Sequence, residues 1–308
     1  MVGGSFSPAS PLSQPAKFSI SSGESVFNIA GDLASKKIIN SPFLFIVYSA
    51  VSGNFSRFQS GSYIISPGSN IREVVLTLTS GVPDISITIF PGMTLKEADT
   101  MLANDGIIKA GDLINLDLAK LKTDYPFLSK ANNLEGFLMP DTYRIRPDYG
   151  SEKIAETILD NFSNKTKSLF SKDTDIYRTV IIASLLEKEV VSQADKELVS
   201  GIIEKRLSLG MPLQIDATVI YAACSGTFLD CRNITMSDYK SNSPYNTYAN
   251  KGLPPAPIGN PTVDSIIAAL SPKTSKYLYY LTDSRTHQTI FSATFNQHDE
   301  NRSKYLGL

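Results

Sequence analysis

Hydrophobic and polar positions in the first hundred residues repeat one pattern, in which a short alternating run is followed by a turn and then by apolar positions at helical spacing. Thr94 and Glu97 have the spacing of a helix-capping box, which marks one of the helix starts. Such units indicate a small α/β module ahead of a larger domain, although strand–turn–helix units are common in any α/β protein. The predicted strands are near 18–20, 61–65 and 85–89, and the helices that follow them near 26–33, 71–78 and 95–102.

The second half of the chain is richer in helical spacing, so the predicted class is α+β: a small α/β module, then a helix-rich α+β domain. We expect a flexible leader at residues 1–16, the module at 17–80 and the larger domain at 81–308. Helices are predicted at about 152–170, 175–191, 195–207 and 263–270, followed by paired strands at 277–282 and 289–294.

Composition narrows the possible functions. Hydrophobic residues make up 42% of the chain and charged residues 19%, as in an ordinary globular protein. With 29 basic against 30 acidic side chains the net charge is −1, so no basic surplus is available for a phosphate backbone, and we expect no nucleic-acid partner. The sequence has no run of about 18 apolar residues, so it predicts no membrane span.

Cys224 and Cys231 are the two cysteines of the sequence. No CxxC pair or His-rich cluster accompanies them, so we expect no metal site, and no motif indicates another cofactor. The short separation of the two cysteines allows a disulfide in an oxidising compartment and equally allows two free thiols.

The stretch 181–190 is apolar on nearly every side and ends with two acids, Glu187 and Glu189. At about 100° per residue their carboxylates point some 200° apart. Glu189 follows Ile182 and Leu185 by seven and four positions, which places it on the most apolar face. We expect Glu187 to face solvent. A carboxyl on an apolar surface has a raised pKa, as a general acid at neutral pH requires, although a structural pairing with a buried Arg or Tyr would also explain an acid there.

Two further segments combine polar and aromatic side chains. In one, alternation places Gln214, Asp216 and Thr218 on the same side of a predicted extended segment, where they could line a groove. In the other, Tyr245 and Asn246 precede a proline-rich loop and offer the flat ring and planar amide that bind sugars. An ordinary surface loop explains the second segment equally well.

Taken together, these segments resemble the YceG-like family of endolytic murein transglycosylases. The resemblance covers nearly the whole chain from about residue 18. The motifs that carry it, in the order in which the family has them, are 135–143 (EGFLMPDTY), 183–189 (ASLLEKE), 205–221 (KRLSLGMPLQIDATVIY), 243–248 (SPYNTY), 252–258 (GLPPAPI) and 277–280 (YLYY).

The resemblance implies an N-terminal membrane anchor, a LysM-like module and an extracytoplasmic (periplasmic) catalytic domain, with this chain as the soluble part of a single-pass inner- or plasma-membrane protein. LysM-like modules bind N-acetylated glycans. The family usually has Pro after the groove Asp, where this chain has Ala217. Glu189 corresponds to the family's catalytic acid. The residues expected to bind substrate are Gln214, Asp216, Thr218, Tyr245, Asn246 and, least firmly, Glu187.

The implied activity is that of a lyase, which cuts the β-1,4 bond between N-acetylmuramic acid and N-acetylglucosamine without water. One carboxyl acts first as acid and then as base, leaves a 1,6-anhydro end and so terminates elongation of a nascent strand. The implied partners are peptidoglycan strands and peptidoglycan synthases (penicillin-binding proteins). Two alternatives stay open, a lysozyme-type muramidase that hydrolyses the same bond and a non-catalytic peptidoglycan-binding scaffold.

Overall fold

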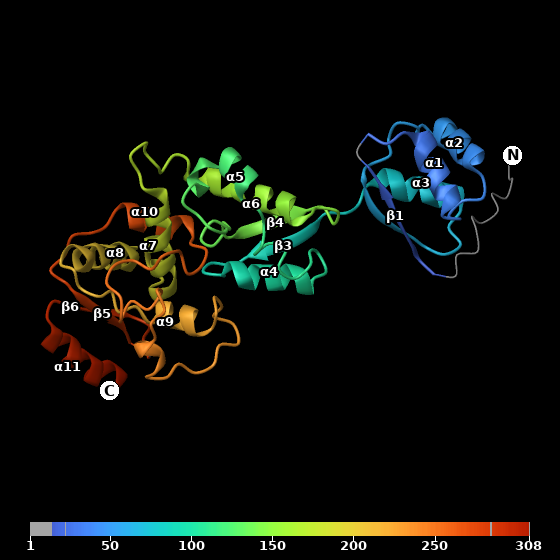
Figure 1. The fold of residues 1–308 in the computed structure, drawn as a ribbon. Coiled ribbons are helices and arrows are strands. Elements are labelled where there is room, and N and C mark those ends of the chain that lie inside the picture. Colours follow the sequence, from blue (N-terminus) through green and yellow to red (C-terminus); the bar gives the residue numbers. More distant parts are fainter. Residues whose placement is uncertain (1–13, 22, 284, 308) are drawn as a thin grey trace. The chain divides into compact units, whose positions relative to one another are not determined.

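The structure is a computed structural model and describes residues 14–21, 23–283 and 285–307 (Figure 1). Most of the leader predicted for residues 1–16 lies outside the described residues, and Ala16 already begins a strand. The chain divides into two compact units, the first formed by residues 1–86 and 144–149 and the second by residues 87–143 and 150–308.

The first unit begins with a strand–helix–helix–strand run. β1 (Ala16–Ile20) pairs antiparallel with β2 (Gly61–Ile65), and Phe18 stands opposite Tyr63. The connection between the strands forms α1 (Val26–Ser35) and α2 (Pro42–Val51), and α3 (Ile71–Ser80) follows β2. One core joins these elements, and its fully buried side chains include Phe18, Leu33, Phe45 and Leu78.

A short segment from later in the sequence, Arg144–Tyr149, also belongs to the first unit. The guanidinium of Arg146 donates a hydrogen bond to the carbonyl of Ser60, and it forms an ion pair with Asp148 whose N–O distance is 3.0 Å. Two separate stretches of sequence therefore build this unit.

The second unit is helical with small sheets. β5 (Tyr279–Thr282) pairs antiparallel with β6 (Thr289–Ser292). β3 (Ile85–Ile89) pairs with β4 (Asp141–Ile145), and residues 85–86 and 144–145 of these two strands belong to the first unit. The helices of the second unit are α4 (Leu95–Asn104), α5 (Ala119–Asp124), α6 (Ser151–Thr166), α7 (Ile176–Glu189), α8 (Gln193–Ser208), α9 (Asp216–Ala223), α10 (Val263–Leu270) and α11 (Phe295–Leu306), with single 3-10 turns at Pro126–Leu128 and Asp238–Lys240.

The centre of this unit is α7, which packs against α8, α9 and α10 (Figure 1). Its residues from Thr179 to Leu186 are all buried, which explains the all-round apolar sequence of the helix. The loop before α10 closes over it, because the backbone N–H of Ile258 donates to the Ser184 hydroxyl over 3.1 Å. A buried helix held from several sides gives a fixed position to the residues at its end.

The predicted α+β class is confirmed, as are the helices with strong apolar spacing and the capping box of Thr94 and Glu97. The elements α5, α9, α11 and β4 were not predicted. The extended segment predicted across 211–221 is wrong in its second half, because α9 begins at Asp216. None of the helices in the described part of the chain is long and apolar enough to cross a membrane.

Candidate active site

The last residue of α7, Glu189, stands where the buried helix meets the C-terminal sheet. The Asp175 side chain caps the other end of α7 by accepting a 3.2 Å hydrogen bond from the backbone N–H of Arg178. After Glu189 the chain turns extended at Val190, which is again buried. The carboxyl of Glu189 is therefore anchored by core packing on both sides in sequence.

Three groups surround the Glu189 carboxyl. The hydroxyl of Tyr280, on β5, donates a 2.9 Å hydrogen bond to Oε2, and the backbone N–H of Ala217 donates to the same carboxyl. Loss of solvent raises the pKa of Glu189 to about 7; the nearby negative charge of Asp216 adds to the rise, and the two hydrogen bonds oppose it. The raised pKa expected from the apolar helix face is confirmed, and near neutral pH such a carboxyl can both give and take a proton.

Ala217 lies in the first turn of α9, where backbone N–H groups lack partners within the helix. The N-cap residue, Ile215, makes no side-chain capping bond, and the Glu189 carboxylate accepts one of these N–H groups from outside the helix. The positive end of the helix dipole favours the ionised carboxylate as well. Burial thus lets a large share of Glu189 hold its proton near neutral pH, while α9 and Tyr280 stabilise the anion that remains after proton transfer.

Asp216 supplies a second carboxylate beside Glu189, and it is exposed. Its Oδ1 accepts a 2.5 Å hydrogen bond from the hydroxyl of Tyr248, and the hydroxyl of Tyr239 also donates to it. The rings of Tyr239 and Tyr248 meet edge to face, with centroids 4.9 Å apart. A fixed negative charge therefore lies next to the candidate acid, against an aromatic wall.

Gln214 is exposed and lies two residues before the first turn of α9, with a φ of 54° in the left-handed region. Its backbone N–H donates to the Thr247 carbonyl over 3.1 Å. The buried guanidinium of Arg206 fixes the preceding residue, because Nη1 donates to the Leu213 carbonyl over 2.7 Å. Unfavourable backbone conformations of this kind cluster at functional sites. Arg206 was not among the predicted site residues, since nothing in its local sequence shows that it is buried.

Thr218 and Asn246, both predicted to bind substrate, are wholly buried. The Thr218 hydroxyl donates to the Ile215 carbonyl over 2.7 Å and lies 2.9 Å from the Thr247 hydroxyl. The Asn246 amide donates to the carbonyls of Tyr239 and Ser241 over 3.0 and 2.9 Å. Both side chains order the loop beside α9, and neither is presented to a ligand at the surface.

Glu187 was expected to face solvent, and that expectation is wrong, because its side chain is only 9% exposed. Its Oε2 accepts hydrogen bonds from the Thr262 N–H (2.9 Å), the Thr262 hydroxyl (2.7 Å) and the Ser265 hydroxyl (2.5 Å) at the start of α10. The ammonium of Lys196, on α8, lies 3.4 Å away. Burial alone would raise the pKa of Glu187, but these partners hold it below the usual range. Glu187 ties three helices together.

Tyr245 belongs to a second group of polar residues, around Glu135. Its ring lies 5.0 Å from the ring of Tyr221, whose hydroxyl donates to Oε2 of Glu135 over 2.9 Å. Burial raises the pKa of Glu135 to about 8. Lys188 lies between Glu187 and Glu189 in the sequence, and burial lowers its pKa. Its ammonium nitrogen is 3.6 Å from the ring centroid of Phe228. Glu135 lies in the first motif of the family resemblance, but no local sequence pattern predicted a role for it.

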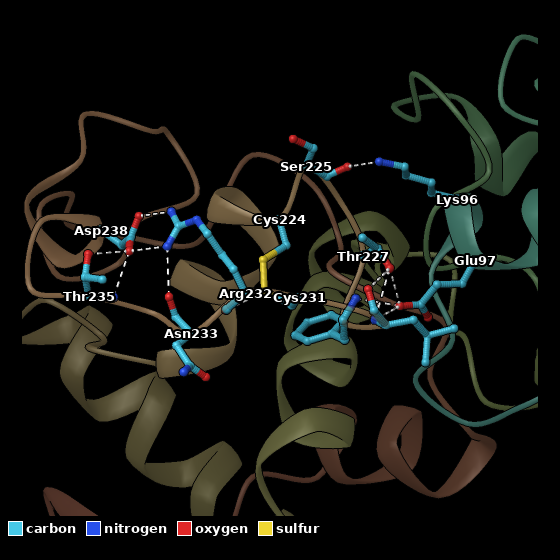
Figure 2. Close-up of a disulfide and its surroundings, with 12 residues drawn as sticks. Lys96, Glu97, Cys224, Ser225, Thr227, Cys231, Arg232, Asn233, Thr235 and Asp238 are labelled. Carbon is cyan, nitrogen blue, oxygen red and sulfur yellow. Dashed lines mark hydrogen bonds and ion pairs between the residues drawn. A yellow bond between two sulfur atoms is a disulfide. The ribbon is translucent and has the colours of Figure 1, made fainter.

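A loop whose Phe228 contacts Lys188 and Tyr221 of this second group is closed by a disulfide between Cys224 and Cys231 (Figure 2). The loop is bound to Glu97 of α4, whose Oε1 accepts from the backbone N–H groups of Phe228 (2.5 Å) and Leu229 (3.0 Å) and from the Thr227 hydroxyl. The sequence left a disulfide and two thiols equally open, and the structure has the disulfide.

Comparison with known proteins places this geometry in context. A family model described as the YceG-like family matches residues 18–304. A Bacillus subtilis (strain 168) protein named endolytic murein transglycosylase is 31% identical, over 99% of this chain and 91% of the relative. A protein of the same name from Streptococcus pneumoniae serotype 2 (strain D39) is 26% identical, over 93% of this chain and 58% of that relative. A crystal structure of a yceG-like protein from Listeria monocytogenes is similar with a TM-score of 0.63 and 28% identity, over 94% of this chain and 99% of that one.

Proposed function

This chain belongs to the YceG-like family, and from that premise we propose that it is an endolytic murein transglycosylase whose acid/base residue is Glu189. The names of the relatives in Bacillus subtilis and Streptococcus pneumoniae support the activity. The observation that carries the assignment of Glu189 is its setting: one carboxyl with a pKa of about 7, held between Tyr280 and the first turn of α9.

In the first step, protonated Glu189 gives its proton to the glycosidic oxygen between N-acetylmuramic acid and N-acetylglucosamine. The bond from C1 of the muramyl sugar to that oxygen breaks, and the N-acetylglucosamine side leaves as an alcohol. Positive charge develops at C1 in an oxocarbenium-like transition state. The carboxylate of Asp216 stabilises that charge, because it is fixed by tyrosine hydroxyls before the reaction begins.

In the second step, the Glu189 carboxylate takes the proton from the muramyl 6-hydroxyl, and that oxygen bonds to C1. The product is a 1,6-anhydro ring, Glu189 regains its proton, and no water is consumed. The attacking oxygen belongs to the same sugar, so its effective concentration at C1 is high. The Tyr280 hydroxyl and the Ala217 N–H serve this step by holding the carboxylate between the two proton transfers.

The residues predicted to bind substrate fall into two groups, those proposed to contact the strand and those proposed to act indirectly. Asp216 is exposed beside Glu189, Gln214 is exposed two residues before it in the sequence, and both are proposed to position the muramyl sugar. Tyr245 is partly buried within the Glu135 group and is proposed as a stacking surface for a sugar farther along the strand. Thr218, Asn246 and Glu187 act indirectly, by holding the loop and helices that carry the contact residues.

The family resemblance also supports a setting. We place the enzyme on the extracytoplasmic side of the plasma membrane, held by an N-terminal anchor, where it terminates nascent strands beside peptidoglycan synthases. The strand–helix–helix–strand run of the first unit, β1 to β2, is proposed to act as a LysM-like module that holds N-acetylated glycan.

Digestion of purified, uncross-linked glycan strands tests the assignment, with the products identified by mass spectrometry. Wild type is expected to produce 1,6-anhydromuramyl ends. Glu189→Gln should give no products while its circular dichroism spectrum is unchanged. Glu204→Gln is the matched control, because it converts a partly exposed acid on α8, paired with Arg178, to its amide and should leave cleavage intact.

Three results would contradict the proposal in different ways. Reducing ends in place of anhydro ends would indicate a lysozyme-type hydrolase, with Asp216 as the second carboxylate. Strand binding without products at any enzyme concentration would indicate a scaffold. Full activity in Glu189→Gln would move the chemistry to another residue.

A further inference from the structure

The outward face of α2 consists entirely of apolar side chains. Of its ten residues, Phe45 and Ser49 are buried and lie on one side of the helix. Apart from Pro42 at the first position, the exposed residues fall within an arc of roughly 120° on the opposite side, counting about 100° per residue. A surface helix normally carries polar and charged residues on that arc. The residues of this arc, here named the α2 stripe, are Phe43, Leu44, Val47, Ala50 and Val51.

The side chains of the α2 stripe do not contribute to the core of the first unit. α2 packs on α1 and α3, and the wholly buried Phe45 already supplies its large core side chain. Phe43 is 71% exposed and Val51 85% exposed, so they gain little from folding. Single apolar residues at the surface are ordinary, but an uninterrupted apolar face marks an interaction surface.

Two further exposed phenylalanines lie outside α2, Phe27 on α1 and Phe55 in the segment after α2. Phe55 follows the end of α2 by four residues, and its ring meets that of Phe27 edge to face, with centroids 6.0 Å apart. Phe27 is 62% exposed and Phe55 41% exposed. Exposed aromatic and aliphatic side chains of this kind are the groups that enter the headgroup region of a bilayer.

The charged residues on either side of α2 in the sequence all have one sign. Between Asp32 and Glu73 the sequence contains no acidic residue, although the chain as a whole has a net charge of −1. Lys36, Lys37 and Arg57 lie in this interval, on both sides of α2 in sequence, and all three are exposed. An apolar helix face flanked by cations is typical of a segment that lies in the interface of an anionic membrane.

We propose that the α2 stripe docks onto the surface of a lipid bilayer that contains anionic phospholipid. The apolar side chains enter the interface, and Lys36, Lys37 and Arg57 meet the headgroup phosphates. A second copy of this chain fits less well, since a twofold interface on the stripe would bring the same cations of both copies together. Docking uses neither Glu189 nor its neighbours, so the inference stands independently of the cleavage reaction.

Flotation of the full chain with vesicles tests the proposal, with phosphatidylcholine vesicles compared with vesicles that also contain phosphatidylglycerol. Wild type should float with the anionic vesicles and much more weakly with the neutral ones. Phe43→Ser with Val47→Ser should lower the partition coefficient by about tenfold or more. The control pair, Leu209→Ser with Met236→Ser, removes two exposed apolar side chains from the second unit and should bind like wild type.

Charge reversal tests the electrostatic part. Lys37→Glu with Arg57→Glu should lower binding to anionic vesicles by at least about 25-fold, since loss of one basic residue near such a surface costs about fivefold and each added Glu is repelled as well. The same pair should barely change binding to neutral vesicles. Lys172→Glu with Lys251→Glu reverses two exposed cations of the second unit and should change neither.

A reporter variant covers the case in which the serine pair fails to fold. The sequence contains no Trp, so Phe43→Trp places a single indole in the α2 stripe. Its fluorescence should shift to the blue when anionic vesicles are added, and that of Leu209→Trp should not shift. The proposal is overturned if wild type floats with neither vesicle, if the Phe43→Trp emission does not move, or if sedimentation shows a dimer that Phe43→Ser dissociates.

Discussion

The hydroxyl of Tyr280 donates a 2.9 Å hydrogen bond to the carboxyl of Glu189, 91 residues earlier in the sequence. The contact joins the strand β5 to the end of helix α7. A hydroxyl that donates to a carboxylate stabilises the ionised form, so Tyr280 sets how readily Glu189 gives up its proton and how well the resulting anion is held.

Tyr280→Phe should raise the pKa of Glu189 further above 7, because it removes a donor to the charged form. Activity that needs protonated Glu189 is lost as pH rises through this pKa, so the alkaline limb of kcat/KM should move to higher pH. The rate at pH 7 should fall by about 10- to 100-fold, the value of one hydrogen bond to a charged group. Tyr277→Phe, on the same segment but stacked on Phe291, is the control. An unmoved alkaline limb in Tyr280→Phe would separate Tyr280 from proton transfer.

Ala217→Pro removes the second donor to Glu189 without removing a side-chain contact. Proline is tolerated in the first turn of a helix, and it is the residue that the family usually has at this position. We expect the alkaline limb of kcat/KM to rise by about one pH unit, with the fold retained. Ala217→Gly keeps the N–H and should leave the limb in place. If the alkaline limb of kcat/KM moves equally in Ala217→Pro and Ala217→Gly, the shift is due to packing and not to the lost N–H.

Glu189→Gln should make the protein more stable at alkaline pH. A pKa of about 7 in the folded state, above the ordinary 4.5, means that folding disfavours the ionised form. This penalty is absent below pH 4.5 and complete above pH 7, where it amounts to roughly 3 kcal/mol. Urea unfolding of wild type and variant at pH 4 and pH 8 measures it. A difference that is the same at both pH values would contradict the raised pKa.

Glu187→Gln should destabilise the fold and lower activity only as the folded fraction falls. It leaves the buried ammonium of Lys196 without its carboxylate, which costs about 3–5 kcal/mol in unfolding free energy. The pKa of Glu187 is lowered in the folded protein, so its stabilisation is present at neutral pH and lost as pH falls through that pKa. The two unfolding free energies should therefore converge in acid. Glu204→Gln breaks the more exposed pair with Arg178 and should cost about 0–1 kcal/mol.

Elements with strong apolar spacing could be predicted from the sequence, and so could the raised pKa of Glu189. The pattern 181–190 is a local property of one helix, and a carboxyl at its apolar end loses water whatever covers it. The same helical spacing predicted the wrong environment, an exposed one, for Glu187. Its face is covered by the start of α10 and by Lys196 of α8, which are distant in sequence.

The prediction that Gln214, Asp216 and Thr218 line one side of an extended segment was wrong for a different reason. Alternation of Gln214, Asp216 and Thr218 fits an extended strand, but the left-handed backbone of Gln214 ends the extended run and a helix starts two residues later. Thr218 then turns inward to the Ile215 carbonyl. Tyr280, Arg206 and Glu135 acquire their roles only through long-range packing, for which a single sequence holds no periodic signal.

The return of Arg144–Tyr149 to the first unit has a consequence for biosynthesis. A nascent chain cannot complete that unit when residue 86 leaves the ribosome, because Arg146 has still to be translated before it can bond to Ser60. The contacts of Arg144–Tyr149 with the rest of the first unit therefore form only after residues 87–143 of the second unit have been translated. A fragment cut at the end of α3 would lack this contact and should be cleaved faster by protease than the same unit within the whole chain.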